Sequence, residues 1–109
     1  MVMTKFALYV PLEAKPGKEA AVETFLNSGL GLVNEEPLTI TWYALKFSDS
    51  TFGIFDTFES DEGRDAHLSG KVAEALLAKA DKLLASPPII EKVDILAVKS
   101  DQKSKETSA

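Results

Sequence analysis

The sequence predicts an α+β fold in which two helices cover one face of a four-stranded antiparallel sheet. Four segments have the residue pattern of strands and two have the periodicity of helices, and they follow one another in the order β-α-β-β-α-β. That order is typical of the split βαβ unit of ferredoxin-like sandwiches. The length of 109 residues suits one domain with one core.

The first strand is predicted over residues 5–14. Apolar side chains alternate there and place Phe6, Leu8, Val10 and Leu12 on one face. Pro11 has no N–H to donate to a neighbouring strand, so we expect a bulge or a locally unpaired position at that residue.

The first helix is predicted after Pro16-Gly17. Apolar residues recur at helical spacing at Val22, Phe25, Leu26 and Gly29. Gly29 and Gly31 each cost a helix about 1 kcal/mol relative to alanine. We therefore expect the helix to end at these glycines, with residues 30–33 in the following turn.

Two central strands are predicted next. Residues 38–47 are rich in β-branched and aromatic side chains, and residues 51–58 show the same preference. Residues 48–50, Ser-Asp-Ser, suit a tight hairpin loop between them.

The second helix is predicted to begin at a cap formed by Ser60 or Asp61 and to end before Pro87-Pro88. Its apolar stripe comprises Ala66, Ala73, Leu76, Leu77, Ala80 and Leu84. Residues 69–70, Ser-Gly, are a candidate interruption of this helix. The closing strand is predicted over residues 89–99.

The domain is expected to span residues 1–99. Residues 100–109 lack apolar periodicity and are expected to form a disordered tail. The N-terminus lacks the pattern of a secretory signal, and no apolar run approaches the roughly 18 residues of a membrane span. We therefore expect a soluble cytoplasmic protein without a membrane partner.

Composition excludes several classes of function. The net charge of −5 opposes binding to the phosphate backbone of nucleic acids. The absence of cysteine excludes disulfides and thiolate metal sites, and one histidine is too few for a usual zinc centre. No phosphate-binding glycine loop is present either. We expect no metal and no cofactor.

Several predicted strands are apolar on both faces, although two helices cover only one face of a sheet. In the second strand, one face carries Leu38, Ile40, Trp42 and Ala44, and the other carries Tyr43, Leu45 and Phe47. An antiparallel sheet with one face in water normally alternates apolar with polar residues. We therefore expect a homodimer, in which a second copy covers the free face.

Three segments resemble the antibiotic biosynthesis monooxygenase (ABM) domain. They are KPGKEAAVETFL at residues 15–26, TFGIFDTFES at residues 51–60 and DAHLSGKVAEAL at residues 65–76. The resemblance extends over about residues 5–99, and its strongest marks are Pro16-Gly17 and Ala66-His67-Leu68. It implies a dimeric α+β barrel formed by two sheets packed face to face.

The family that the sequence resembles includes cofactor-independent oxygenases of polycyclic phenols, quinols and anthrones, and also haem-degrading enzymes. The haem-degrading members have an asparagine in the first strand and a haem-ligating histidine well into the second helix. Here the first strand has no asparagine, and His67 lies in the first turns of the predicted second helix. The resemblance therefore favours the cofactor-independent members.

His67 and Asp56 are the candidate catalytic residues. His67 is the only side chain whose ordinary pKa lies near neutrality, and near the mouth of a pocket it would accept a proton from a phenolic substrate. The alternative, which we favour, is a structural hydrogen bond to neighbouring backbone. Asp56 lies on the same predicted face as Ile54 and Phe58, so its carboxylate needs a partner. It would orient His67 or bind a substrate hydroxyl, or, as we favour, pair with a Lys, Arg or Tyr.

Four aromatic residues are candidate walls of a site for a flat substrate: Trp42, Tyr9, Tyr43 and Phe55. The alternative, which we favour, is that they fill the core and the dimer interface. Two functions stay open. One is a cofactor-independent monooxygenase acting on a small aromatic substrate (a phenol, quinol or anthrone), and the other is a non-catalytic homodimeric module that binds a ligand or a partner.

Overall fold

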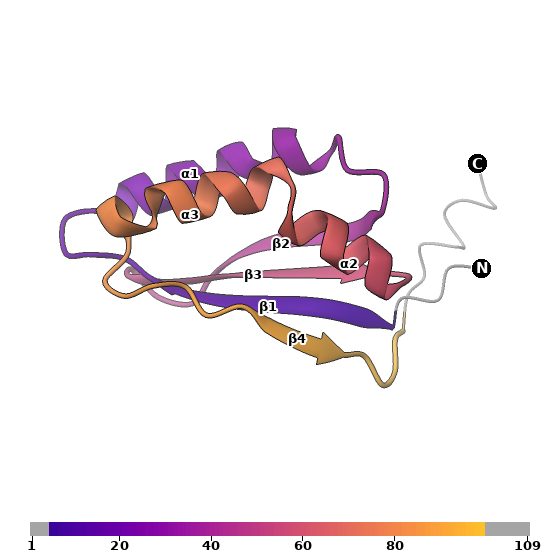
Figure 1. Ribbon diagram of the computed structural model, residues 1–109. Coiled ribbons are helices and arrows are strands. Elements are labelled where there is room, and N and C mark those ends of the chain that lie inside the picture. The colour runs from indigo at the N-terminus through magenta and orange to yellow at the C-terminus, as the bar shows by residue number, and fades with distance from the viewer. Residues whose placement is uncertain (1–4, 100–109) are drawn as a thin grey trace, which may run out of the picture.

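The computed structural model describes residues 5–99, so the predicted tail at residues 100–109 lies outside the described residues. The elements of the described chain, in order, are β1 (Phe6–Glu13), α1 (Glu19–Val33), β2 (Thr39–Lys46), β3 (Thr51–Phe58), α2 (Asp61–Leu68), α3 (Lys71–Leu83) and β4 (Glu91–Asp94). Figure 1 shows the helices as one layer above the sheet.

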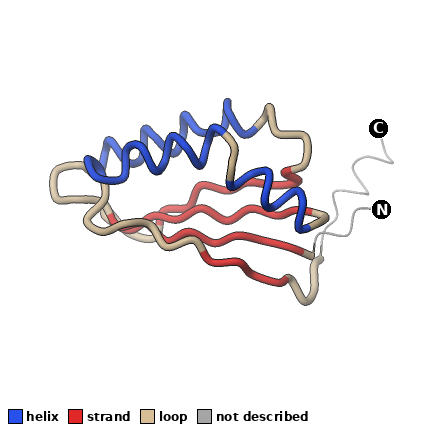
Figure 2. Tube along the Cα trace, in the orientation of Figure 1, coloured by secondary structure: helices blue, strands red, loops and turns tan. Residues whose placement is uncertain are grey.

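The four strands form one antiparallel sheet in the order β2-β3-β1-β4. All the described helices cover the same face, and the opposite face carries no helix (Figure 2). The predicted α+β, ferredoxin-like architecture is therefore confirmed. The predicted second helix is divided into two helices, α2 and α3, which are separated at Ser69-Gly70, the candidate interruption.

The core lies between the sheet and the helices. Side chains at even-numbered positions of β1 and β3 meet the helix side chains there: Val10, Leu12, Phe52 and Ile54 from the sheet pack with Val22, Leu26, Leu76 and Leu84. The period-two alternation predicted for both strands is thus confirmed. Burying a side chain of this kind contributes roughly 1.5–3 kcal/mol, so this cluster is the main source of stability.

Helix α1 continues through Gly29 and Gly31 to Val33, so the prediction that it ends at these glycines was wrong. Gly29 lies against the indole ring of Trp42, and a Cβ placed at Gly29 would be 3.3 Å from Cη2 of that ring. The glycine allows the helix to approach β2 closely. Packing of the helix on the sheet therefore outweighs the propensity cost of about 1 kcal/mol per glycine.

The apolar stripe predicted for one long helix was wrong at two positions. Ala66 is exposed, and Leu77 is 56% exposed, whereas Ala73, Leu76 and Leu84 are buried. The break after Leu68 explains Ala66, because α2 and α3 are separate helices and a single stripe no longer runs through both of them. Leu77 is in the same helix as the buried Leu76, and as the next residue it is turned about 100° away from it, toward solvent.

The closing strand is shorter than predicted. β4 comprises only Glu91–Asp94 and pairs with residues 6–9 of β1, and Leu96 beyond it is 97% exposed. Pro11 therefore lies past the end of the β4 pairing, in register with Gly53 of β3. The locally unpaired position expected at Pro11 is present on the β4 side. The register irregularity of the sheet lies in β2 instead, between Thr39 and Thr41, and it removes Ile40 from the regular alternation with Trp42.

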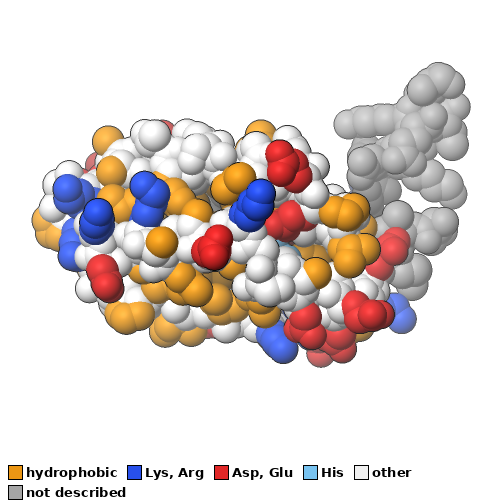
Figure 3. Space-filling view, turned by 45° about the horizontal axis from the view of Figure 1, so that its top comes forward, with side chains coloured by type: hydrophobic (Ala, Val, Ile, Leu, Met, Phe, Trp, Pro, Cys, Tyr) orange, Lys and Arg blue, Asp and Glu red, His pale blue; other side chains and the backbone are white. Residues whose placement is uncertain are grey.

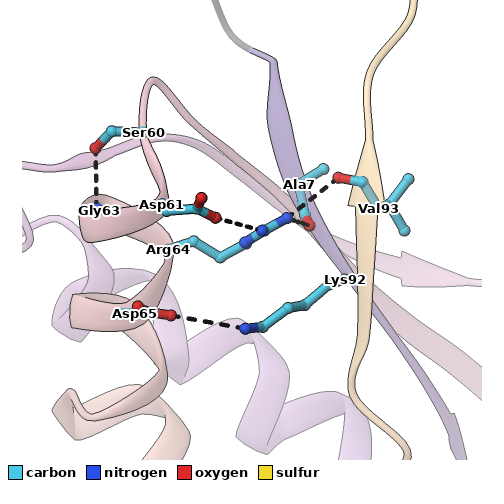
Figure 4. A network of polar contacts seen from close by, with 8 residues as sticks. All are labelled: Ala7, Ser60, Asp61, Gly63, Arg64, Asp65, Lys92 and Val93. Atoms are coloured by element: carbon cyan, nitrogen blue, oxygen red, sulfur yellow. Dashed lines mark hydrogen bonds and ion pairs between the residues drawn. The ribbon is translucent and has the colours of Figure 1, made fainter.

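Arg64 of α2 ties this helix to two strands (Figure 4). Its Nη1 donates to the backbone oxygens of Ala7 in β1 at 3.4 Å and Val93 in β4 at 3.5 Å, while Nη2 lies 2.5 Å from Asp61. The guanidinium also lies over the ring of Phe6, 5.2 Å from its centroid. These contacts set the position of α2 on the sheet, and α2 carries His67.

Candidate functional site

The position of His67 follows from the way α2 begins. Ser60 has the extended backbone of an N-cap, and its hydroxyl accepts a hydrogen bond from the backbone N–H of Gly63 at 3.1 Å. Asp61 and Glu62 in the first turn suit the positive end of the helix dipole. With the start of α2 set in this way, His67 points toward β3 and is only 6% exposed. His67 therefore lies inside the fold, against β3.

The imidazole of His67 lies between two carboxylates. Its Nε2 is 2.9 Å from Oδ2 of Asp56, and its Nδ1 is 2.6 Å from Oε1 of Glu36. The ring of Phe58 packs beside it, with the two ring centroids 5.5 Å apart. The partner of Asp56 is thus His67, not the Lys, Arg or Tyr that we favoured. The partner of His67 is a pair of carboxylates, not the backbone.

Asp56 is turned toward the helices by the alternation of β3, and it is 1% exposed. Oδ2 of its carboxylate lies 2.9 Å from Nε2 of His67, so the two groups form a buried ion pair when His67 is protonated. A carboxylate buried in this way depends on a positive charge nearby, because an isolated buried charge is very costly.

Sequence reasoning missed Glu36, which lies in the loop between α1 and β2. Besides facing His67, its Oε1 accepts a hydrogen bond from the hydroxyl of Thr39 at 2.9 Å, whereas its Oε2 is buried without a partner among the described residues. The neighbouring Glu35 is exposed. Two adjacent glutamates before Pro37 look alike in the sequence, so no local pattern separates the buried one from the exposed one.

The three groups shift one another's pKa. Burial raises the pKa of Asp56 above its usual value of 3.8 and outweighs the lowering by His67. Burial alone would lower the pKa of His67, but the contacts with Asp56 and Glu36 outweigh it and raise that pKa above the usual 6.5. His67 therefore keeps its proton to a higher pH than a free histidine does.

A cavity of about 400 Å³ lies beside His67 and Glu36, between the end of α1, the following loop and α2. Most of its wall is aliphatic and comes from Leu32, Pro37, Leu38 and Ala66. Its volume lies in the range of about 300–1,000 Å³ that is usual for sites of small organic ligands. The cavity therefore joins an apolar wall to the only cluster of charged groups in the described chain that is largely buried away from solvent.

The four aromatic candidates are not brought together. Trp42 lies on the helix side of the sheet, in register with Asp56, and its Nε1 is buried without a partner among the described residues. Tyr43 and Phe55 stack on the opposite face, with ring centroids 6.4 Å apart, and Tyr9 is in register with Phe55 there. None of the four lines the cavity beside His67. The idea that Trp42 and Tyr9 form two walls of one site was wrong, because they lie on opposite faces of the sheet.

Within residues 5–99, no group of three or more His, Cys, Asp or Glu side chains is arranged to hold a metal ion. Among the helices described, none is long and apolar enough to cross a membrane.

Comparison with solved structures identifies the relatives of this chain. The structure of the Nitrosomonas europaea protein NE2512, whose function is unknown, is 58% identical in sequence, with a TM-score of 0.88 and coverage of 92% of this chain and 97% of that chain. The chain belongs to the same family as NE2512.

The comparisons also reach proteins named for antibiotic biosynthesis. A candidate antibiotic biosynthesis monooxygenase from Caulobacter crescentus is 18% identical, with a TM-score of 0.74 and coverage of 86% of this chain and 92% of that chain. A second candidate of that name, from Chloroflexus aurantiacus, is 17% identical, with a TM-score of 0.68 and coverage of 89% and 98%. These likenesses confirm the ABM-like fold. No family model and no curated protein matches the chain.

Proposed function

We propose that this protein is a cofactor-independent monooxygenase of the ABM type, an oxidoreductase that acts on a small aromatic substrate such as a phenol, quinol or anthrone. The observation that carries the proposal is the cavity of about 400 Å³ with His67 in its wall, held between Asp56 and Glu36. The fold shared with the monooxygenase candidates supports the reaction class, and the aliphatic wall suits an apolar substrate body.

In the proposed reaction His67 accepts a proton from the substrate. Asp56 is buried and faces Nε2, so Nδ1 is the nitrogen available toward the cavity once the carboxylate of Glu36 turns away from it. The deprotonated, electron-rich substrate then reacts with oxygen directly. For an anthrone, the ring CH₂ becomes a carbonyl, one oxygen atom enters the product, and the other leaves in water together with the two hydrogens.

The pH dependence of this reaction follows from the same contacts. His67 accepts a proton only in its neutral form, and its pKa is raised above 6.5 by the two carboxylates. We expect kcat/KM to rise with pH through a pKa above 6.5. Asp56→Asn removes one of the carboxylates, so this pKa is expected to move down in that variant.

Oxygen uptake with an anthrone or a quinol tests the proposal. His67→Ala is expected to lower turnover by about 10²–10⁴-fold, the usual contribution of a positioned acid–base group. The comparison is made at a temperature where circular dichroism shows the variant to be folded. Turnover of the variant at the wild-type rate would remove His67 from the mechanism.

One observation favours a second function, a non-catalytic ligand-binding module. Both ring nitrogens of His67 are already engaged by carboxylates, as in a purely structural cluster. Binding of phenolic ligands in the cavity without any oxygen uptake across a broad panel of phenols, quinols and anthrones would favour this module over the enzyme.

We infer that the protein works as a homodimer in which two sheets pack face to face. The face of the sheet without helices carries apolar side chains that are open to solvent in one copy: Tyr43 is 51% exposed and Phe47 is 58% exposed. Tyr9 and Phe55 lie half-buried beside them. By contrast, the helix side seen in Figure 3 mixes apolar side chains with many charged ones. A contiguous apolar face of this kind is typical of a protein interface.

A further inference from the structure

Glu36 has no role in the function proposed so far beyond its contact with His67, yet its carboxylate is held on several sides. Oε1 faces Nδ1 of His67 at 2.6 Å and accepts a hydrogen bond from Thr39 at 2.9 Å. Oε2 is directed at Gly70, where a Cβ would lie only 2.8 Å from it. Gly70, which directly precedes α3, has no side chain and therefore leaves room for the carboxylate of Glu36.

Oε2 of Glu36 is a buried acceptor without a donor among the described residues. A buried carboxylate oxygen usually accepts at least one hydrogen bond, so Oε2 can accept one from a donor in the cavity. The Glu36 side chain as a whole is 18% exposed. Because the last torsion of a glutamate side chain is broad and roughly two-fold, a small turn presents a carboxylate oxygen to a ligand in the cavity.

The charges of Asp56, Glu36 and His67 beside the cavity do not cancel. Asp56 and Glu36 face one imidazole, so the cluster keeps an excess of one negative charge when both carboxylates are ionised and His67 is protonated. Lys71 and Glu35 also line the cavity, but both are exposed and opposite in sign. Solvent screens those two charges much more than the buried cluster. A ligand that reaches His67 therefore meets a negative potential.

We propose that Glu36 is a specificity-determining residue. Its carboxylate, whose Oε2 has no partner among the described residues, accepts a hydrogen bond from a neutral hydroxyl-bearing ligand and repels carboxylate ligands of the same shape. This inference rests on the proposed function for the location of the site. It concerns binding, so it is tested without turnover.

The test uses 2-naphthol and 2-naphthoate, which have the same ring system and differ in charge at neutral pH. Binding is followed by titration calorimetry, and NMR signals of the imidazole of His67, the only histidine of the chain, report whether the ligand occupies this cavity. In the wild-type protein, 2-naphthol is expected to shift these signals and to bind at least about tenfold more tightly than 2-naphthoate, a difference of about 1.4 kcal/mol.

Glu36→Gln keeps the shape of the side chain and removes its charge, so the tenfold preference is expected to fall to nearly one. Glu35→Gln is the matched control. It removes an exposed carboxylate from the adjacent position, and the preference is expected to change by less than about twofold, because solvent screens that charge.

Gly70→Ala serves as a second variant in case Glu36→Gln folds poorly. This variant keeps every charge but places a methyl group against Oε2 of Glu36. It is therefore expected to shift the His67 signals and to reduce the preference for 2-naphthol over 2-naphthoate. Tighter binding of 2-naphthoate in the wild-type protein, an unchanged preference in Glu36→Gln, or no shift of the His67 signals by either ligand would each overturn the proposal. A failure to consume oxygen would count against the monooxygenase function and leave this binding result unaffected.

Discussion

Replacing His67 by glutamine is expected to destabilise the folded protein strongly. His67 is 6% exposed, and its side chain is the cation placed between Asp56 and Glu36. Glutamine has a similar length and is neutral, so the variant leaves two buried carboxylates without a positive charge. Removing one partner of a buried ion pair costs about 3–5 kcal/mol.

The expected shift in melting temperature follows from that figure. One kcal/mol corresponds to about 4–8 °C for a domain of 60–100 residues, so a loss of about 3 kcal/mol lowers the midpoint by roughly 12–24 °C. The assay is thermal and urea unfolding of both proteins at pH 6. The double variant Asp56→Asn with His67→Gln is the control, because it also removes the more deeply buried of the two carboxylates. It is expected to be more stable than His67→Gln alone.

The loss is also expected to depend on pH. The folded protein raises the pKa of His67 above 6.5, so the stabilisation from its charge is complete below pH 6.5 and disappears as the pH rises through the folded-state pKa. Asp56 is present in both proteins, so the pH dependence of the difference between them near neutrality comes from the titration of His67. The gap between wild type and His67→Gln should therefore narrow at alkaline pH. A variant within about 0.5 kcal/mol of the wild type at pH 6 would refute the argument that the cluster depends on this cation.

Two further predictions concern the helix layer and the free face of the sheet. Gly31→Ala is expected to stabilise α1 by up to about 1 kcal/mol, because a Cβ at Gly31 meets nothing within 4 Å. Gly29→Ala must displace the ring of Trp42, so this variant is expected to be at least about 1 kcal/mol less stable than Gly31→Ala. Equal urea midpoints for the two variants would contradict this. The wild-type protein is expected to be a dimer by light scattering at micromolar concentration, with roughly 2,000 Å² or more buried in total, and Tyr43→Glu on the free face is expected to shift it toward monomer. A monomer mass for the wild type would refute this assembly.

The sequence by itself determined the features that depend on local periodicity. The alternation of β3 places Asp56 on the same side as Ile54, and the pattern at Ser60 begins α2 where it was predicted. The alternation of β2 likewise places Trp42 and Tyr43 on opposite faces of the sheet, because neighbouring residues of a strand point to opposite sides. These features follow from backbone geometry over a few residues, so a single sequence is enough to predict them.

Only the tertiary structure decided which of these residues meet. Glu36 and His67 are 31 positions apart, and their contact requires α2 to pack on β3 while the loop after α1 folds over it. The continuation of α1 through Gly29 was decided in the same way, by the ring of Trp42 on β2. Contacts of this kind depend on how whole elements fill a shared volume. The energy of such packing exceeds the local preferences that a sequence displays, so the candidate site emerges only when the helices and the sheet are brought together.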